Sequence, residues 1–197
     1  MKVKDWMIKK VITAKPDNTI EDAIQIMKKY SIRHLPIVEG KKLIGFVTES
    51  NLRPYLISEK LHLPLKDVMI LNPITIDPDA SIDEAARLIY HYKIGGLPVV
   101  NGEYLEGIIT VTDILEAFIE FMGILKSSSR LDVIPKDDNL DEVLEIIKKQ
   151  GGKIISIGMD VNPEGDKIYY VRLEKIPLEK IALNLEIFGH KIVSMIE

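Results

Sequence analysis

The chain has no cysteine among its 197 residues, which excludes disulfides, thiolate metal sites and cysteine nucleophiles. It also lacks the phosphate-loop pattern GxxxxGK[ST], the metalloprotease pattern HExxH and the hydrolase pattern GxSxG. His62, His91 and His190 are scattered and show no metal-ligand spacing with carboxylates. Since no nucleophile, metal set or acid–base pair emerges, the sequence predicts a protein that is not an enzyme and requires no cofactor.

Long hydrophobic runs are missing as well. The most membrane-like stretch, residues 108–125, carries Asp113, Glu116 and Glu120 and is shorter than the ~20 apolar residues of a membrane span. The amino terminus has no apolar stretch of signal-peptide length. A net charge of −4 gives no broad basic surface for nucleic acid. We therefore expect a cytoplasmic, soluble protein with neither a membrane nor a nucleic-acid partner.

What the chain does contain is an internal repeat. Residues 5–52 recur 62 positions later without an insertion. The matching pairs include Asp5/Asp67, Met7/Met69, Thr13/Thr75, Pro16/Pro78, Pro36/Pro98, Gly45/Gly107 and Thr48/Thr110. A repeated unit that cannot bury its own apolar face packs on its copy. We expect the two copies to form a cleft with near-twofold symmetry, and we expect function to lie in that cleft.

Each copy predicts the element order β-α-β-β-α. Short β-branched runs end at Pro-Asp turns, and capping boxes then open helices with apolar residues at i, i+3, i+4 and i+7. Buried strands and hairpin partners follow around Gly turns, and a second helix closes each unit. The expected ranges are strands 11–13 and 74–76, helices from 19 and 81, strands 35–38 and 97–100, strands 43–48 and 105–110, and helices from about 50 and 112.

The rest of the chain predicts a different unit. Strands at 130–134, 153–159, 167–173 and 191–196 alternate with two helices, one capped by Asp138-Asn139 and one with Pro177 in its first turn. This βαββαβ order is the ferredoxin-like arrangement. The predicted boundaries are 1–62 for the first repeat, 63–125 for the second, 126–129 for a polar linker and 130–197 for the last unit.

The repeats resemble a known family. Leu97-Pro-Val-Val100 and Gly107-Ile-Ile-Thr-Val-Thr-Asp113 look like the signature of cystathionine-β-synthase (CBS) domains, and 35–38 with 45–51 look like a slightly altered copy. The resemblance implies an α+β fold in which the CBS pair forms one disc-like module, often dimeric, with adenosine-containing ligands between its halves. The last unit resembles an ACT domain, a regulatory fold that often binds amino acids. This layout is similar to that of acetoin-utilisation regulatory proteins.

The resemblance also implies roles for the closing segment of each repeat. In the family, the aspartate accepts hydrogen bonds from ribose hydroxyls, and the serine or threonine positions contact phosphate. Carried onto this chain, Asp113 is the ribose residue, and Thr110 and Thr112 lie on the phosphate side. The alternative is that Thr112 or Asp113 only caps a helix.

The first copy departs from this pattern, because Asn51 stands where the second copy has its aspartate. An amide is a weaker acceptor than a carboxylate. The case for a full site around Thr48, Ser50 and Asn51 is therefore weaker.

The segments before each Leu-Pro also differ, and here it is the first copy that has the polar and charged residues. The first copy has Arg33-His34 and the second has Gly95-Gly96. Family members place basic side chains here, which makes Arg33 a candidate phosphate clamp supported by His34. The alternative is a surface arginine and a packing histidine. Residues from the opening and Leu-Pro strands complete the candidate contacts, with apolar contact to adenine expected from Val11, Ile12 and Ile74, and with Pro98 added from its strand. The hypothesis is one good nucleotide site rather than two equal ones.

Together these patterns predict a non-enzymatic sensor that binds AMP, ADP or ATP in the cleft of its CBS pair. The alternative is a dimeric assembly module whose cleft is empty or binds S-adenosylmethionine. Helix 113–125 has so wide an apolar surface that it needs more than one neighbour, which predicts a homodimer. The turn 135–139 lacks the glycine of amino-acid-binding ACT domains, so we expect an interface role for the last unit.

Overall fold

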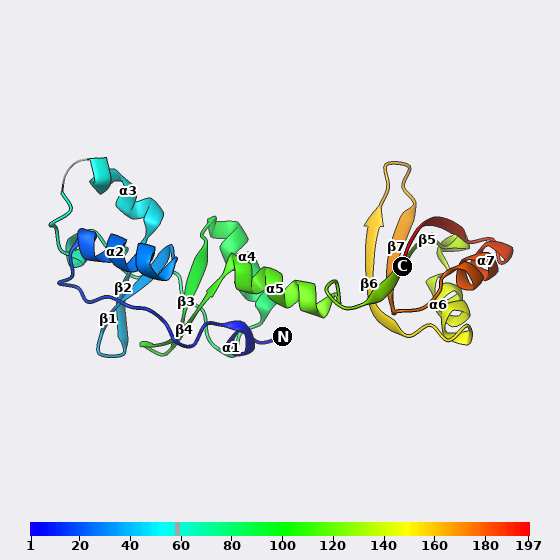
Figure 1. Cartoon of the computed structure of the whole chain (residues 1–197), viewed down its shortest axis with the longest axis horizontal. Helices are drawn as coiled ribbons and strands as arrows, with labels where there is room; N and C mark the ends of the chain where they lie inside the picture. The colour runs from blue at the N-terminus through cyan, green and yellow to red at the C-terminus, as the bar shows by residue number, and fades with distance from the viewer. Residues whose placement is uncertain (58–59) are drawn as a thin grey trace. The chain divides into compact units, whose positions relative to one another are not determined.

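The computed structural model describes residues 1–57 and 60–197. It divides into two compact units, Met1–Ala117 and Phe118–Glu197. Each unit contains one four-stranded antiparallel sheet accompanied by helices, which gives the α+β class expected from the sequence (Figure 1). The strand orders are β1-β2-β4-β3 in the first unit and β6-β7-β5-β8 in the second.

Apart from the opening strand of each repeat, the elements follow the predicted order in both parts of the chain. The first repeat and the segment after it contain α1 (Val3–Trp6), α2 (Ile20–Tyr30), β1 (His34–Glu39), β2 (Lys42–Thr48), α3 (Glu49–Ile57) and the 3-10 helix η1 (Leu65–Asp67). The second repeat contains α4 (Ile82–Tyr92), β3 (Gly96–Asn101), β4 (Tyr104–Thr110) and α5 (Val111–Phe121). The remaining elements are β5 (Ser128–Ile134), η2 (Lys136–Asp138), α6 (Leu140–Lys149), β6 (Ile154–Val161), β7 (Lys167–Glu174), α7 (Glu179–Ile187) and β8 (Lys191–Ile196).

The predicted capping box is complete at the start of α2, and at the start of α4 its first hydrogen bond is present. The Asp22 N–H donates to Thr19 Oγ1 at 3.1 Å, and the Thr19 N–H donates back to the Asp22 carboxylate at 2.9 Å. This backbone hydrogen bond, followed by one from Asn18, lowers the pKa of Asp22. In α4 the Glu84 N–H donates to Ser81 Oγ at 3.0 Å. Both helices therefore begin where the sequence places them, because their free N–H groups are satisfied locally.

The predicted opening strands at 11–13 and 74–76 are wrong. Each shrinks to one parallel bridge, Ala14 with Ile37 and Ile76 with Val99. The Ala14 N–H donates to the Pro36 carbonyl, and the Val38 N–H donates to the Ala14 carbonyl, both at 3.0 Å. The next bond of a parallel ladder would need an N–H from Pro36, or from Pro98 in the second copy. Proline has none, so the ladder stops after one residue.

The first residues of each repeat pair with the other repeat. Ile8 exchanges two backbone hydrogen bonds with Ile108, at 2.9 and 3.1 Å, and Ile70 exchanges two with Phe46, at 2.8 and 3.1 Å. The buried Leu65 lies in the hydrophobic core of the first repeat. The opening segments are thus exchanged between the copies. The boundary predicted between residues 62 and 63 stays a prediction. It separates the two repeats along the sequence, whereas in space each opening segment packs on the opposite repeat.

The repeated glycines of β2 and β4 make this exchange possible. A Cβ at Gly45 would lie 2.2 Å from Met69 Sδ, and a Cβ at Gly107 would lie 2.4 Å from Met7 Sδ. Each glycine therefore leaves room for a methionine from the opposite opening segment. This accounts for the matching pairs Gly45/Gly107 and Met7/Met69 in the repeat.

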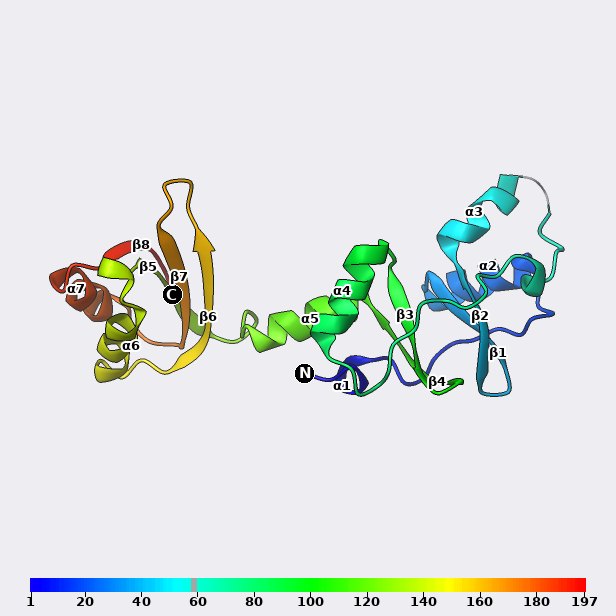
Figure 2. The same cartoon turned by 180° about the vertical axis from the view of Figure 1, so that it is seen from behind.

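The second unit has the βαββαβ order predicted for it. Its helices α6 and α7 lie on the same face of the sheet (Figure 2), and the core between them contains Leu131, Val143, Val171 and Leu185. Two details differ from the expectation. β5 already begins at Ser128, inside the predicted linker, and Pro177 precedes the helix because Leu178 is the N-cap of α7. The resemblance to an ACT domain stays a prediction.

The exchange makes a specific prediction for Leu65, which belongs to the second half of the sequence repeat but is fully buried in the core of the first copy. We expect Leu65→Ala to lower the free energy of unfolding by about 2–5 kcal/mol. Hydrogen exchange should show the loss of protection in α2 and β1. The matched control is Lys66→Ala, which removes only an exposed ion pair with Asp17 and should change stability by about 1 kcal/mol or less. Loss of protection confined to residues 82–110 would contradict the exchange.

Candidate ligand site

Two cavities in the first unit correspond to each other under the 62-residue shift. The larger, of about 400 Å³, lies at the start of α3, and we call it the Arg53 pocket. The smaller, of about 330 Å³, lies at the start of α5, and we call it the Asp113 pocket. Thr48 and Ser50 line the first where Thr110 and Thr112 line the second. The cleft expected from the repeat therefore exists as two related pockets.

The Asp113 pocket brings together seven of the residues predicted from the sequence, which are Val11, Ile12, Arg33, His34, Thr110, Thr112 and Asp113. The lining also includes Lys10, a cationic residue that was not predicted from the sequence. The exchanged opening segment supplies residues 8 and 10–12, and the first repeat supplies Arg33 across the pseudo-twofold. One pocket thus contains an apolar wall, the three hydroxyl side chains of Ser31, Thr110 and Thr112, one carboxylate and two cationic side chains.

Asp113 has one oxygen occupied and one available. Its Oδ2 accepts hydrogen bonds from the Thr110 N–H and the Thr110 hydroxyl, both at 2.7 Å. Its Oδ1 has no hydrogen-bond partner among residues 1–57 and 60–197. The first oxygen therefore fixes the start of α5, while the second can accept a hydrogen bond from a ligand hydroxyl.

Asn51 has the equivalent position in the first copy but a different role. Its Oδ1 accepts from the Thr48 N–H, and its amide nitrogen donates to the Val68 carbonyl at 3.1 Å. Val68 belongs to the exchanged segment, so this amide ties α3 to it. The Asn51 side chain does not line the Arg53 pocket. Pro98, another predicted contact, is buried in β3 and lines neither pocket.

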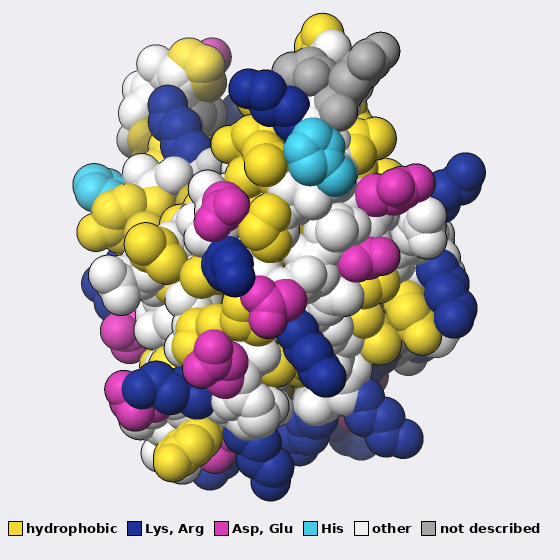
Figure 3. Space-filling model, turned by 90° about the vertical axis from the view of Figure 1, so that its left-hand side faces the viewer, with side chains coloured by type: hydrophobic (Ala, Val, Ile, Leu, Met, Phe, Trp, Pro, Cys, Tyr) yellow, Lys and Arg dark blue, Asp and Glu magenta, His cyan; other side chains and the backbone are white. Residues whose placement is uncertain are grey.

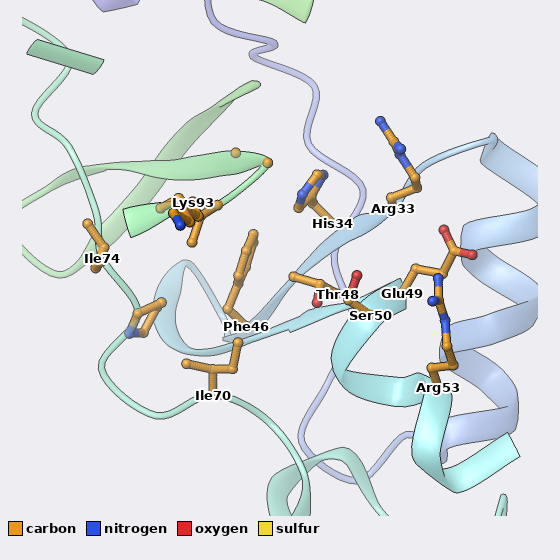
Figure 4. Close-up of a pocket in the computed structure, with 14 residues that line it drawn as sticks. Arg33, His34, Phe46, Thr48, Glu49, Ser50, Arg53, Ile70, Ile74 and Lys93 are labelled. Atoms are coloured by element: carbon orange, nitrogen blue, oxygen red, sulfur yellow. The ribbon is translucent and has the colours of Figure 1, made fainter. Parts of the chain in front are cut away.

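The Arg53 pocket contains three cationic side chains from both repeats (Figure 4). Arg33 precedes β1, Arg53 extends from α3, and Lys93 follows α4. Glu49 is the one acidic residue in the lining of this pocket. Ile74, predicted to contact adenine, lies here together with Thr48 and Ser50, and so separately from Asp113.

His34 lies at the junction of the two pockets and lines both. Its ring stacks on Phe46 with centroids 6.1 Å apart, and a Cβ at Gly95 would lie 2.6 Å from its Nε2. Gly95 therefore provides the space that this imidazole fills. Burial, and secondarily the neighbouring Arg33 charge, lower the pKa of His34 below its usual value. At neutral pH the ring is uncharged, so it can donate a hydrogen bond to a phosphate but supplies no positive charge.

Some pocket residues had little signal in the sequence. Lys10 and Lys93 have no cationic counterpart 62 positions away, where Asn72 and Ser31 stand. Arg53 lies one helical turn after Glu49, a spacing that places both on one side of α3. This spacing was the available clue for Arg53. Lys10 directly precedes the predicted contacts Val11 and Ile12, and that position was the available clue for it.

Charged side chains of both signs lie among hydrophobic ones on the face of the first unit that carries α2 and α3 (Figure 3). The net charge of the whole chain is −4. The cationic side chains in the linings of the two pockets suit a small anionic ligand.

Comparison with known proteins gives a consistent family likeness. The model of the CBS domain matches residues 3–58 and 65–120, together more than half of the chain. Inosine-5'-monophosphate dehydrogenase from Korarchaeum cryptofilum is 36% identical over 115 residues, which are 57% of this chain and 23% of that protein. The chain thus spans about a quarter of the length of the first curated relatives that it matches.

Solved structures show the same similarity in three dimensions. The acetoin utilization protein AcuB from Vibrio cholerae matches with a TM-score of 0.58 at 35% identity, over 63% of this chain and 94% of that one. The CBS domain pair of MJ0100, solved with 5-methylthioadenosine and S-adenosyl-L-methionine, has a TM-score of 0.56 at 35% identity, over 60% and 99%. CBSX2, solved with AMP and known from Arabidopsis thaliana, has a TM-score of 0.55 at 26% identity, over 60% and 96%.

Within the described part of the chain, every helix is too short or too polar to cross a bilayer.

Because Asn51 and Asp113 have different roles, exchanging amide and carboxylate should reduce stability more at Asn51 than at Asp113. Asn51→Asp replaces the donor to the Val68 carbonyl with a carboxylate oxygen, so the free energy of unfolding should fall by about 1–3 kcal/mol. Asp113→Asn keeps an oxygen acceptor for Thr110 and should change stability by about 1 kcal/mol or less. Urea denaturation of both variants measures the difference. Equal losses would show that the two positions are structurally equivalent.

The lowered pKa of His34 predicts a pH-dependent contribution to stability. As pH falls below the ordinary value of 6.5, the unfolded chain binds a proton at His34 that the folded chain resists. The folded state therefore loses stability as pH falls from 6.5 toward the lower folded pKa. In urea denaturation between pH 7.5 and 5.5, His34→Gln should lose less stability than the wild type. If both lose the same amount, or if NMR titration of the His34 ring in the wild type gives an ordinary pKa, the assignment of a buried neutral ring is wrong.

Proposed function

The chain belongs to the CBS domain family, and from that premise we propose that its CBS pair is a sensor that binds an adenosine-containing ligand in the Asp113 pocket. The family match supports a regulatory module, and the lining of the Asp113 pocket supports that pocket as the ligand site. The protein is non-enzymatic and acts by passing a change in the cleft to its second unit or to a partner. A homodimer is part of the same proposal.

The observation that carries the proposal is the available oxygen of Asp113. It lies in a cavity of about 330 Å³, within the roughly 300–1,000 Å³ that small-molecule sites occupy. Ribose hydroxyls are donors that a free carboxylate oxygen accepts well. Val11 and Ile12 line the same pocket and offer apolar contact for a base.

A phosphate-bearing nucleotide fits this pocket better than an uncharged adenosine compound. Lys10 and Arg33 both line it, and Thr110 and Thr112 add hydroxyl groups at the start of α5. Cations and a helix amino terminus together favour an anion. AMP is the smallest ligand that combines a ribose with a phosphate. S-adenosylmethionine, the ligand solved with MJ0100, is the alternative within this class.

Regulation requires that the ligand bind two states of the protein with different affinities. The exchanged segments offer a place for such a difference. Residues 10–12 line the Asp113 pocket, and Ile8 is hydrogen-bonded into β4 of the second repeat. A ligand held between these residues and Asp113 stabilises the segment in its docked position.

The second candidate function is a dimeric assembly module. Large hydrophobic side chains are exposed on α4 and α5 in the first unit, with Tyr90 at 86%, Leu115 at 56% and Val111 at 50% exposure. Such residues are suited to contact with a second copy of the chain. This function requires no ligand in either pocket.

We expect AMP to bind the wild-type chain in isothermal titration calorimetry, and Asp113→Ala to weaken that binding about tenfold or more, because the ribose loses its charged acceptor. The matched control is Glu116→Ala, which removes an exposed carboxylate from the same helix outside both pockets and should leave AMP affinity unchanged. AMP at 100 times its dissociation constant should also stabilise the fold by ~2.7 kcal/mol, a shift of a few degrees in melting temperature.

Unchanged AMP affinity in Asp113→Ala would place the ligand elsewhere. A larger thermal shift with S-adenosylmethionine than with AMP would change the ligand and keep the site. If AMP, ADP, ATP and S-adenosylmethionine all leave the melting temperature unchanged, the assembly module is the better account.

A further inference from the structure

The two pockets are not independent, because three residues line both of them. These residues are Arg33, His34 and Gly95. Strand pairing explains part of this arrangement. His34 lies opposite Thr48 in its own hairpin, and Gly96 lies opposite Thr110 in the other. Where the two hairpins meet across the pseudo-twofold, the first residue of β1, His34, and the residue before β3, Gly95, line both cavities.

The shared residues carry a single permanent charge. Arg33 is cationic, its counterpart Gly95 has no side chain, and the buried His34 ring is neutral at neutral pH. The Arg53 pocket adds Arg53 and Lys93 against Glu49, and the Asp113 pocket adds Lys10 against Asp113. Without Arg33, the Asp113 pocket has no net positive charge, and the Arg53 pocket still has one. A phosphate in the Asp113 pocket therefore depends strongly on Arg33.

The Arg33 side chain is free to serve either pocket. Its carbonyl accepts a hydrogen bond from the Glu49 N–H at 3.0 Å, so its backbone is fixed at the start of α3. The side chain is exposed, and the guanidinium has no hydrogen bond or ion pair within the described ranges 1–57 and 60–197. In Figure 4 it extends away from Arg53 and Ser50. No contact commits it to one cavity.

We propose that the Arg53 pocket binds a small polyanion that needs no ribose, and that this binding weakens nucleotide binding in the Asp113 pocket because both ligands require Arg33. The first part follows from the lining, which has three cations and no available carboxylate equivalent to Asp113, since Asn51 is held by Val68. The second part rests on the proposed function. By thermodynamic reciprocity, the nucleotide weakens the polyanion by the same factor.

This arrangement makes the chain sensitive to two ligands in opposition. A polyanion that recruits Arg33 leaves Lys10 as the cationic side chain in this lining that holds the nucleotide phosphate, while Asp113 keeps the ribose. The antagonism has an upper limit, because the nucleotide keeps its other contacts when the polyanion is bound. Simple competition for one pocket would have no such limit. A plateau therefore distinguishes coupled pockets from a single shared one.

Inorganic pyrophosphate is the probe for the Arg53 pocket, and calorimetry at constant ionic strength is the measurement. We expect saturating pyrophosphate to raise the dissociation constant of AMP about tenfold and then to reach a plateau. Pyrophosphate should change the dissociation constant of adenosine, which has no phosphate, less than twofold. In Arg33→Gln the pyrophosphate effect on AMP should fall below twofold. The matched control is Arg87→Gln, which removes the same charge from an exposed position on α4 outside both pockets and should keep the full antagonism.

Four outcomes would overturn the inference while AMP binding stands. The first is that pyrophosphate binds without changing AMP affinity, and the second is that its effect on AMP affinity persists in Arg33→Gln. The third is that this effect grows with pyrophosphate concentration without a plateau. The fourth is that pyrophosphate binds Arg53→Gln as tightly as the wild type. Failure of AMP to bind the wild-type chain is a different result. It would overturn the proposed function, and the antagonism with it.

Discussion

Each copy of the repeat is completed by the opening residues of the other copy, and the remaining structure of the first unit depends on this exchange. Ile8 pairs with β4 and Ile70 pairs with β2, so each hairpin gains a neighbour from the opposite repeat. Gly45 and Gly107 make the close approach possible, because a side chain at either position would occupy the space of a methionine. A single copy would leave one edge of its hairpin unpaired and part of its core open. The duplication is therefore a structural requirement and not only a trace of ancestry.

The same exchange sets what the pockets contain. The opening segment of the first copy and the closing strand and helix of the second copy line one cavity, where residues 8 and 10–12 meet residues 108 and 110–113. The two copies then differ in how they use the third residue of their closing helices, Asn51 in α3 and Asp113 in α5. The Asn51 amide donates to the Val68 carbonyl of the exchanged segment, whereas Asp113 Oδ1 has no hydrogen-bond partner within residues 1–57 and 60–197 and is the atom proposed to accept from a ligand. Structure and ligand chemistry thus compete for one side-chain position, and each copy resolves that competition differently.

Much of the fold was accessible from sequence because its signals are local. Capping at Thr19 and Ser81, the glycine turns and the helical stripes need only neighbouring residues to be read. The opening strands failed because Pro36 removes a donor from a strand more than 20 residues away. The exchange was hidden for a related reason. Copies related by a constant shift offer Ile8 two similar partners, and local patterns cannot choose between them. Lys10 was missed although its neighbours Val11 and Ile12 were predicted, because the second copy has Asn72 at its position and the repeat gave no charge to compare; seven of the predicted site residues still met in one pocket.

The family match identifies the module, and the differences between its two copies are the basis of the site proposed for it. The central claim is that a nucleotide lies in the Asp113 pocket with its ribose on the free carboxylate oxygen. A crystal structure of the chain with AMP tests this claim most directly. The account predicts ribose hydroxyls within hydrogen-bond distance of Asp113 Oδ1 and the phosphate near Lys10 and Arg33. AMP bound in the Arg53 pocket alone, or on the second unit, would contradict it.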